Sequence, residues 1–110
     1  MNGKLTTHVL DTAAGKPAAG IPVRLFRFQE NERMPVTEMR TNADGRTDEP
    51  LLQGSGFLPG NYELVFRVAE YFPDGFYEEI PVKFRISETA RHYHVPLLCS
   101  AWGYSTYRGS

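Results

Sequence analysis

Apolar and polar residues alternate along most of this chain, and a period of two is typical of β-strands that bury one face. Ile21, Val23 and Leu25 share one face of such a stretch. The same pattern predicts strands at residues 5–10, 21–28, 33–41, 62–68, 80–86, 91–100 and 102–108. A further short strand is expected to begin at Arg46. No segment has the period of an amphipathic helix, and residues 69–75 leave room for at most one short helical turn.

Residues that favour turns separate these stretches. The first turn region covers residues 11–20, a long loop covers residues 53–61, and the third strand is closed by Asn42-Ala43-Asp44-Gly45. The Asp-Gly pair supplies the positive φ of a tight turn. Short strands with turns between them indicate an all-β protein, an antiparallel β-sandwich of about eight strands. A chain of 110 residues fits one domain, which is expected to span residues 1–110.

Composition narrows the possible functions. The net charge of -1 and the lack of a basic run argue against nucleic-acid binding. No apolar run approaches the length that crosses a membrane, and residues 1–10 lack the apolar core of a signal peptide, so a cytoplasmic location is expected. The single cysteine, Cys99, cannot form an internal disulfide framework. It alternates onto the core face with Val95 and Leu97, which predicts packing and not reactivity.

Two histidines stand out on faces that should point away from the core. The alternation puts His8 and His94 outward on the strands at residues 5–10 and 91–100, each beside a leucine, Leu10 or Leu98. An outward face that mixes histidine with leucine is typical of a subunit interface or a ligand cleft. An exposed histidine is, however, more often simply solvated, so the spacing alone does not assign either residue a role.

A metal site is not expected. Three histidines and one cysteine lack the paired spacings of a structural zinc site. His92 and His94 could chelate a metal ion from one strand face, but no carboxylate stands at a matching spacing.

Two internal motifs resemble the transthyretin-like (prealbumin-like) sandwiches. Residues 11–25 resemble their first hairpin, and the turn into their fourth strand resembles Thr41-Asn42-Ala43-Asp44-Gly45-Arg46. Such patterns also occur in adhesin stalk and regulatory domains that have no catalytic role. They therefore imply the transthyretin-like fold and leave the activity open.

The two ends of the chain resemble one family much more specifically, the 5-hydroxyisourate hydrolases. Their opening motif is similar to Leu5-Thr6-Thr7-His8-Val9-Leu10-Asp11, and their penultimate strand is similar to His92-Tyr93-His94-Val95-Pro96-Leu97-Leu98. Their terminus is similar to Tyr107-Arg108-Gly109-Ser110. The hormone carrier transthyretin differs at all three places, with a lysine at the position of His8, a threonine at that of His94 and an apolar tail. The resemblance covers nearly the whole chain.

The resemblance implies hydrolysis of 5-hydroxyisourate to 2-oxo-4-hydroxy-4-carboxy-5-ureidoimidazoline in urate breakdown. The catalytic residues that it implies are His8, Arg46, His94 and Ser110. The substrate-binding residues that it implies are His8, Arg46, Leu98, Tyr107 and Arg108. The two histidines would hold the attacking water and exchange protons, while Arg46 would pair with substrate oxygens through its planar guanidinium. Which histidine removes the proton stays open. No cofactor is expected, because the chemistry is acid–base and electrostatic.

The resemblance further implies a homotetramer, a dimer of dimers whose outward sheet faces line a central channel. Two other functions remain to be separated from the enzyme. A transthyretin-like carrier would bind a small ligand without turnover in an apolar or lysine-bearing channel, and His8 and His94 count against it. A structural domain of the adhesin or regulatory type would need no particular tail.

Overall fold

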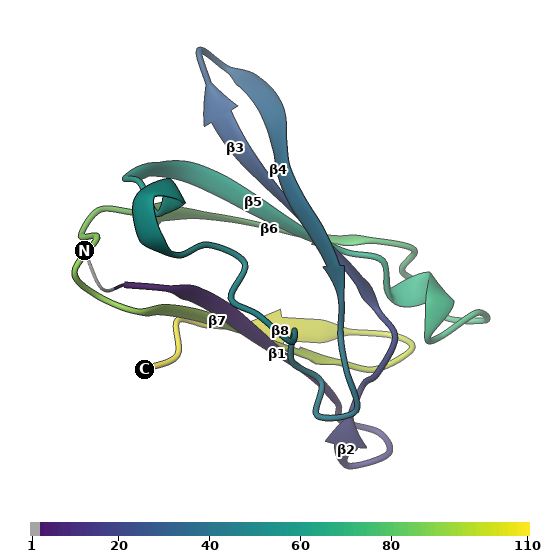
Figure 1. The fold of residues 1–110 in the computed structure, drawn as a ribbon. Coiled ribbons are helices and arrows are strands. Elements are labelled where there is room, and N and C mark those ends of the chain that lie inside the picture. The colour runs from purple at the N-terminus through teal and green to yellow at the C-terminus, as the bar shows by residue number, and fades with distance from the viewer. Residues whose placement is uncertain (1–2) are drawn as a thin grey trace.

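The computed structural model describes residues 3–110 and arranges eight strands in two facing four-stranded sheets (Figure 1). The first sheet has the order β2-β1-β7-β8, and the second has the order β4-β3-β5-β6. The strands are β1 (Leu5–Asp11), β2 (Lys16–Pro17), β3 (Pro22–Gln29), β4 (Glu32–Arg40), β5 (Gly60–Phe66), β6 (Ile80–Ile86), β7 (Tyr93–Cys99) and β8 (Tyr104–Thr106). Two 3-10 helices, η1 (Gly54–Gly56) and η2 (Val68–Glu70), complete the elements. The predicted all-β sandwich is confirmed.

The core lies between the two sheets and is built from the residues that alternation assigned to it. Val9 and Leu97 from the first sheet and Leu25, Leu64 and Phe66 from the second are all 0% exposed. Burying each such side chain stabilises the fold by about 1.5–3 kcal/mol. The inward faces are therefore strongly specified, and the outward faces of the same strands are free to carry chemistry.

One strand pair runs in a direction that the expected antiparallel sandwich does not include. β1 and β7 are parallel, whereas every other pair of strands in residues 3–110 is antiparallel. The register places Thr6 opposite His94 and His8 opposite Pro96. The amino-terminal and penultimate strands are neighbours in the first sheet, so the outward residues of both come to one surface.

The short strand predicted to begin at Arg46 is wrong. Residues 42–50 contain turns and bends and no strand, because side chains in this segment take up the backbone groups that a strand would use. The Asn42 side-chain oxygen accepts hydrogen bonds from the backbone N–H groups of Asp44 (2.9 Å) and Arg46 (3.2 Å), and its amide donates to Asp48 (2.9 Å). The eighth strand is instead β2, a two-residue strand inside the predicted turn region at residues 11–20.

The fifth strand also ends sooner than predicted. Val68 is buried as expected, but it begins η2 instead of extending β5. This 3-10 turn overlaps the segment at residues 69–75 in which one short helical turn was predicted. Within residues 3–110, no helix is long and apolar enough to cross a membrane.

Candidate active site

His94 lies on the outward face of β7 and is held by a residue of the neighbouring strand. Its ring nitrogen Nδ1 is 2.9 Å from the hydroxyl oxygen Oγ1 of Thr6 on β1. Burial lowers the pKa of His94, the positive charges of Arg46 and His8 lower it further, and a backbone hydrogen bond to Thr6 acts in the opposite direction. The two charges act on His94 because Arg46 and His8 lie close to it. A lowered pKa keeps more of the imidazole neutral near pH 7 and able to accept a proton.

His8 is held by the turn that follows β4. Its ring nitrogen Nε2 is 2.9 Å from the backbone carbonyl oxygen of Asp44. A carbonyl oxygen can only accept, so this nitrogen carries a hydrogen and donates it. The second ring nitrogen of His8, Nδ1, is left to interact with other groups.

The same turn places Arg46 beside the two histidines. Gly45, immediately before it, packs on β1: its carbonyl accepts the N–H of Val9 at 2.8 Å, and an added Cβ would lie 2.3 Å from the Val9 carbonyl oxygen. With φ of +75°, Gly45 also has a backbone that residues with a Cβ rarely adopt. The turn is thus fixed against the strand that carries His8. None of the ion pairs within residues 3–110 uses Arg46, whose side chain is exposed and available to a ligand.

His94 and Arg46 line a cavity of about 380 Å³, whereas His8 lies close to His94 but is not part of the lining. Its lining consists of Lys4, Thr6, Arg46, His92, His94 and Ser110. A second cavity of about 160 Å³ shares Thr6 and Arg46 with it. The volume falls in the range of small-molecule sites, and the lining has two cationic side chains and no acidic side chain. Such a cavity suits a small ligand that carries several oxygens or a negative charge.

The carboxyl-terminal end of the chain closes one side of this cavity. The N–H of Gly109 donates to the backbone carbonyl of His94 at 2.7 Å, which forms an isolated bridge between the tail and β7. Chain ends are commonly frayed, but this contact fixes the tail and brings Ser110 to the cavity wall. One cavity is therefore lined by Arg46, His94 and Ser110, although Arg46 lies far from the other two in the sequence.

The other two tail residues point elsewhere. Tyr107 and Arg108 line a cavity of about 310 Å³ between β6 and β7, together with Tyr93 and Val95. The Arg108 guanidinium lies 4.3 Å from the centre of the Tyr93 ring and donates to the His92 carbonyl at 3.3 Å. Within one subunit, neither side chain lines the cavity of His94. Their predicted contact with substrate stays a prediction.

Leu98 lies on the outward face of β7, like His94, and is half-buried. It does not line the histidine cavity in the described chain, so its predicted contact with substrate also stays a prediction. Cys99 is fully buried, as predicted, and burial raises the pKa of its thiol to about 11. No three histidine, cysteine, aspartate or glutamate side chains among residues 3–110 lie together as metal ligands would.

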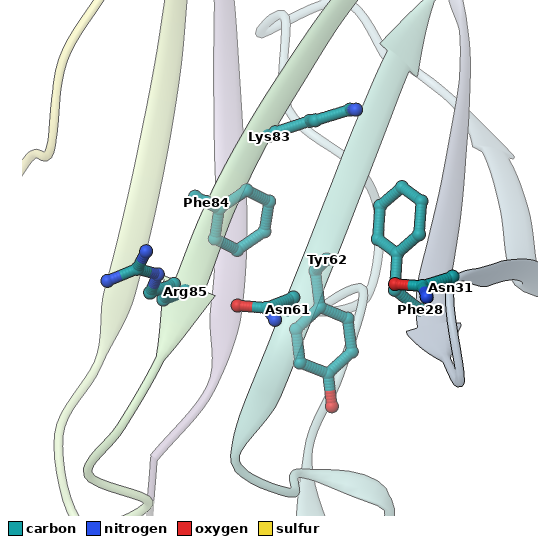
Figure 2. Close-up of a pocket in the computed structure, with 7 residues that line it drawn as sticks. All are labelled: Phe28, Asn31, Asn61, Tyr62, Lys83, Phe84 and Arg85. Atoms are coloured by element: carbon teal, nitrogen blue, oxygen red, sulfur yellow. The ribbon is translucent and has the colours of Figure 1, made fainter.

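A larger cavity lies on the second sheet, and none of the residues that line it is a predicted site residue (Figure 2). Its volume is about 540 Å³, and its lining is Phe28, Asn31, Asn61, Tyr62, Lys83, Phe84 and Arg85. It contains no histidine and no acid–base pair. Size alone therefore does not select the site, and the combination of imidazoles with a guanidinium favours the smaller cavity.

Comparison with known proteins identifies the family. The sequence pattern of the HIUase/Transthyretin family matches residues 5–109. The chain belongs to this family. A 5-hydroxyisourate hydrolase 2 of Rhizobium meliloti (strain 1021) is 50% identical over 117 aligned positions, which cover 99% of this chain and 98% of that protein. The resemblance to the 5-hydroxyisourate hydrolases inferred from the sequence is thereby confirmed.

Solved structures of this family have the same fold. A 5-hydroxyisourate hydrolase of Klebsiella pneumoniae superposes with a TM-score of 0.85 at 31% identity, covering 98% of this chain and 99% of that one. An (S)-allantoin synthase superposes with a TM-score of 0.92 at 42% identity, covering 99% of this chain. This chain spans only 44% of the length of that synthase. The transthyretin-like fold predicted from the sequence is confirmed.

Four contributors to the site were not predicted from the sequence. Lys4, Thr6 and His92 line the cavity. Gly109 leaves no room beside His94, since an added Cβ would lie 2.6 Å from the ring carbon Cδ2. The position of Thr6 was readable from alternation, because it shares the outward face of His8. Its contact with His94 was not readable, because that contact depends on the pairing of β1 with β7. The HIUase/Transthyretin family includes both hydrolases and a carrier by name, so the choice between them depends on this site.

Proposed function

We propose that this protein hydrolyses 5-hydroxyisourate to 2-oxo-4-hydroxy-4-carboxy-5-ureidoimidazoline, a step of urate breakdown. The observation that carries the proposal is the convergence of Arg46 and His94 on one cavity, with His8 close enough to His94 to influence its pKa. Relatives of about half-identical sequence bear the name of this activity. The proposal assigns to this chain the substrate in that name.

The reaction needs a base, an anion-stabilising group and a proton donor. Water attacks a ring carbonyl of the substrate and gives up a proton to a neutral imidazole of the His8 and His94 pair. Negative charge that builds on the carbonyl oxygen is stabilised by the Arg46 guanidinium, whose planar donors suit a pair of oxygens. The carbon–nitrogen bond then breaks, the nitrogen takes a proton from the imidazolium, and the carbon becomes a carboxylic acid that releases its remaining proton to solvent. Atoms and protons balance without any further reagent.

Ser110 and the other tail residues complete the proposed site. Ser110 lines the cavity and offers a hydroxyl to the substrate. Tyr107 and Arg108 line a different cavity of the same subunit, between β6 and β7. We propose that they and Leu98 reach substrate in a homotetramer, where outward faces of neighbouring subunits meet. Light scattering tests this assembly, and full activity of a monomer would contradict it. The cytoplasmic location stays a prediction.

A carrier function is the competing proposal for a chain of this family. A carrier needs tight binding and no turnover, and its cavity needs no neutral base. The His94 imidazole, whose pKa is lowered by burial and by two neighbouring charges, favours proton transfer over simple binding. The lining of the cavity is also polar and cationic instead of apolar.

The test is the decay of freshly generated 5-hydroxyisourate, followed by ultraviolet absorbance with and without the protein. The proposal expects faster decay in proportion to protein concentration, with product released in many turnovers per subunit. Decay at the uncatalysed rate, together with tight binding of an aromatic ligand, would support the carrier and contradict the enzyme.

A further inference from the structure

Thr6 occupies a central position in the site although it carries no charge. It is half-buried on the outward face of β1 and lines both the cavity of His94 and the adjoining cavity that also contains Arg46. Its hydroxyl oxygen lies 2.9 Å from Nδ1 of His94. The residues are 88 positions apart in the sequence but lie opposite each other in the β1–β7 register. The contact is therefore built into the sheet and does not depend on a mobile loop.

The rest of the His94 ring is also fixed, apart from one nitrogen. Gly109 packs so close to the ring that an added Cβ would be 2.6 Å from Cδ2 and 3.3 Å from Cγ. Nδ1 faces Thr6, and Cδ2 faces Gly109, so Nε2 is the ring nitrogen left for a ligand. Among residues 3–110, Arg27 Nε is the buried side-chain nitrogen or oxygen that has no partner. Nε2 of His94 is not a buried atom without a partner, and its ring lines the cavity.

The contacts with Thr6 favour a hydrogen on Nδ1. The Thr6 hydroxyl oxygen lies 2.9 Å from this nitrogen, and a backbone hydrogen bond to Thr6 raises the pKa of His94, as an acceptor of a ring N–H does. A histidine that donates from one ring nitrogen to a neighbouring oxygen presents the lone pair of the other nitrogen. His8 has the opposite arrangement, because its Nε2 donates to the Asp44 carbonyl.

We propose that Thr6 is a positioning residue that keeps the hydrogen of neutral His94 on Nδ1, so that Nε2 accepts the proton of the attacking water. The inference rests on the proposed function for its kinetic consequence. Its structural content, the position of one hydrogen, does not depend on that function. Thr6 itself makes no bond to the reacting atoms in this assignment and acts through His94.

The matched variants are Thr6→Val, which removes the hydroxyl at nearly constant shape, and Thr6→Ser, which keeps it. Valine is β-branched and favours strands, so the fold should be retained, and thermal unfolding checks this. The direct measurement is the tautomer of His94 from ¹⁵N–¹H correlation spectra of the imidazole groups, assigned with His94→Asn. We expect the Nδ1–H form in the wild type and in Thr6→Ser, and a substantial Nε2–H share in Thr6→Val. A wild-type ring with its hydrogen on Nε2 would overturn the proposal whatever the enzyme does.

The kinetic measurement separates positioning from a merely structural effect. Loss of a group that orients a catalytic residue typically costs about 10- to 100-fold in activity, so Thr6→Val should lower kcat by that factor with little change in KM. Thr6→Ser should restore kcat to near the wild-type value. Loss of the acceptor at Nδ1 disfavours the imidazolium form of His94 and so lowers its pKa. The acid limb of the pH profile should therefore move to lower pH in Thr6→Val. The charged and titratable groups around the His94 ring stay the same in this variant, namely Arg46, His8, Lys4 and His92.

Two outcomes separate this inference from the proposed function. An unchanged kcat and tautomer in Thr6→Val, with an active wild type, would overturn the role of Thr6 and leave the hydrolase intact. Absence of any hydrolysis by the wild type would contradict the proposed function, whereas the tautomer spectra would still decide the position of the hydrogen.

Discussion

Gly109→Ala should disable the site through a single methyl group. The new Cβ would lie 2.6 Å from Cδ2 of His94, whereas ordinary contacts of this kind begin near 3.4 Å. The backbone of Gly109 cannot withdraw freely, because its N–H is bonded to the His94 carbonyl at 2.7 Å. The ring therefore has to move by about 1 Å, and a misplacement of that size costs on the order of 100-fold in rate.

The assay is kcat/KM for 5-hydroxyisourate decay, with thermal unfolding measured on the same samples. The control is Gly56→Ala in η1, where an added Cβ meets nothing within 4 Å. We expect Gly109→Ala to lose most of its activity with a modest change in Tm, and the control to behave as the wild type. Activity of Gly109→Ala within a few-fold of the wild type would refute the claim that the tail fixes the ring of His94.

Three further predictions concern other parts of the chain. Arg46→Lys should lower kcat/KM by roughly 10-fold or more in the same assay, because a point charge does not reproduce the bidentate geometry of a guanidinium. Asp11→Asn should lower the free energy of unfolding by about 1–3 kcal/mol at pH 7 in urea titrations. The buried Asp11 carboxylate accepts the Tyr71 hydroxyl at 2.9 Å. Burial raises the pKa of Asp11, but its hydrogen bonds and the charge of Lys16 outweigh burial and hold the pKa below that of an ordinary aspartate. The stability advantage of the wild type over Asp11→Asn should be full above the ordinary pKa and vanish as pH falls through the lowered pKa. Cys99, with a thiol pKa of about 11, should resist alkylation at pH 8 until the protein is unfolded.

Alternation predicted seven of the eight strands and the inward faces that form the core. Leu5, Thr7 and Val9 on β1 are at most 1% exposed, and the residues between them are half-buried, as a period of two requires. The pattern records which face of a strand is buried, but it records neither the partner of the strand nor its direction. The parallel pairing of β1 with β7 could therefore not be predicted from the alternation.

The segment that carries Arg46 shows a second limit of structure prediction from the sequence pattern. Its residues were predicted as a strand, and they form turns because Asn42 and Asp48 bond to each other and Asn42 bonds to the nearby backbone. Polar side chains that compete for backbone hydrogen bonds leave no periodic signal. Arg46 was nevertheless predicted as a site residue from its motif, and it lines the cavity of His94. The strand predicted around Arg46 was wrong, and the catalytic role that the motif implies for Arg46 stays a prediction.

Contacts between distant residues mark the third limit. The bond between His8 and the Asp44 carbonyl joins residues 36 positions apart, and the bond between Thr6 and His94 joins residues 88 apart. Resemblance to the 5-hydroxyisourate hydrolases named the two histidines but not the groups that orient them. Those groups became visible only with the register of the sheet.

The central claim is that His8 and His94, which lie close together beside the cavity lined by His94 and Arg46, act together on one water. The most direct measurement is kcat/KM for 5-hydroxyisourate in the wild type, in His8→Asn, in His94→Asn and in the double variant. Each single change should lower kcat/KM by about 10²- to 10⁴-fold. The double variant should be little less active than the less active of the two single variants, because the effects of residues that act as a unit are not additive. Single variants with near-normal rates, or losses that multiply in full, would contradict the account.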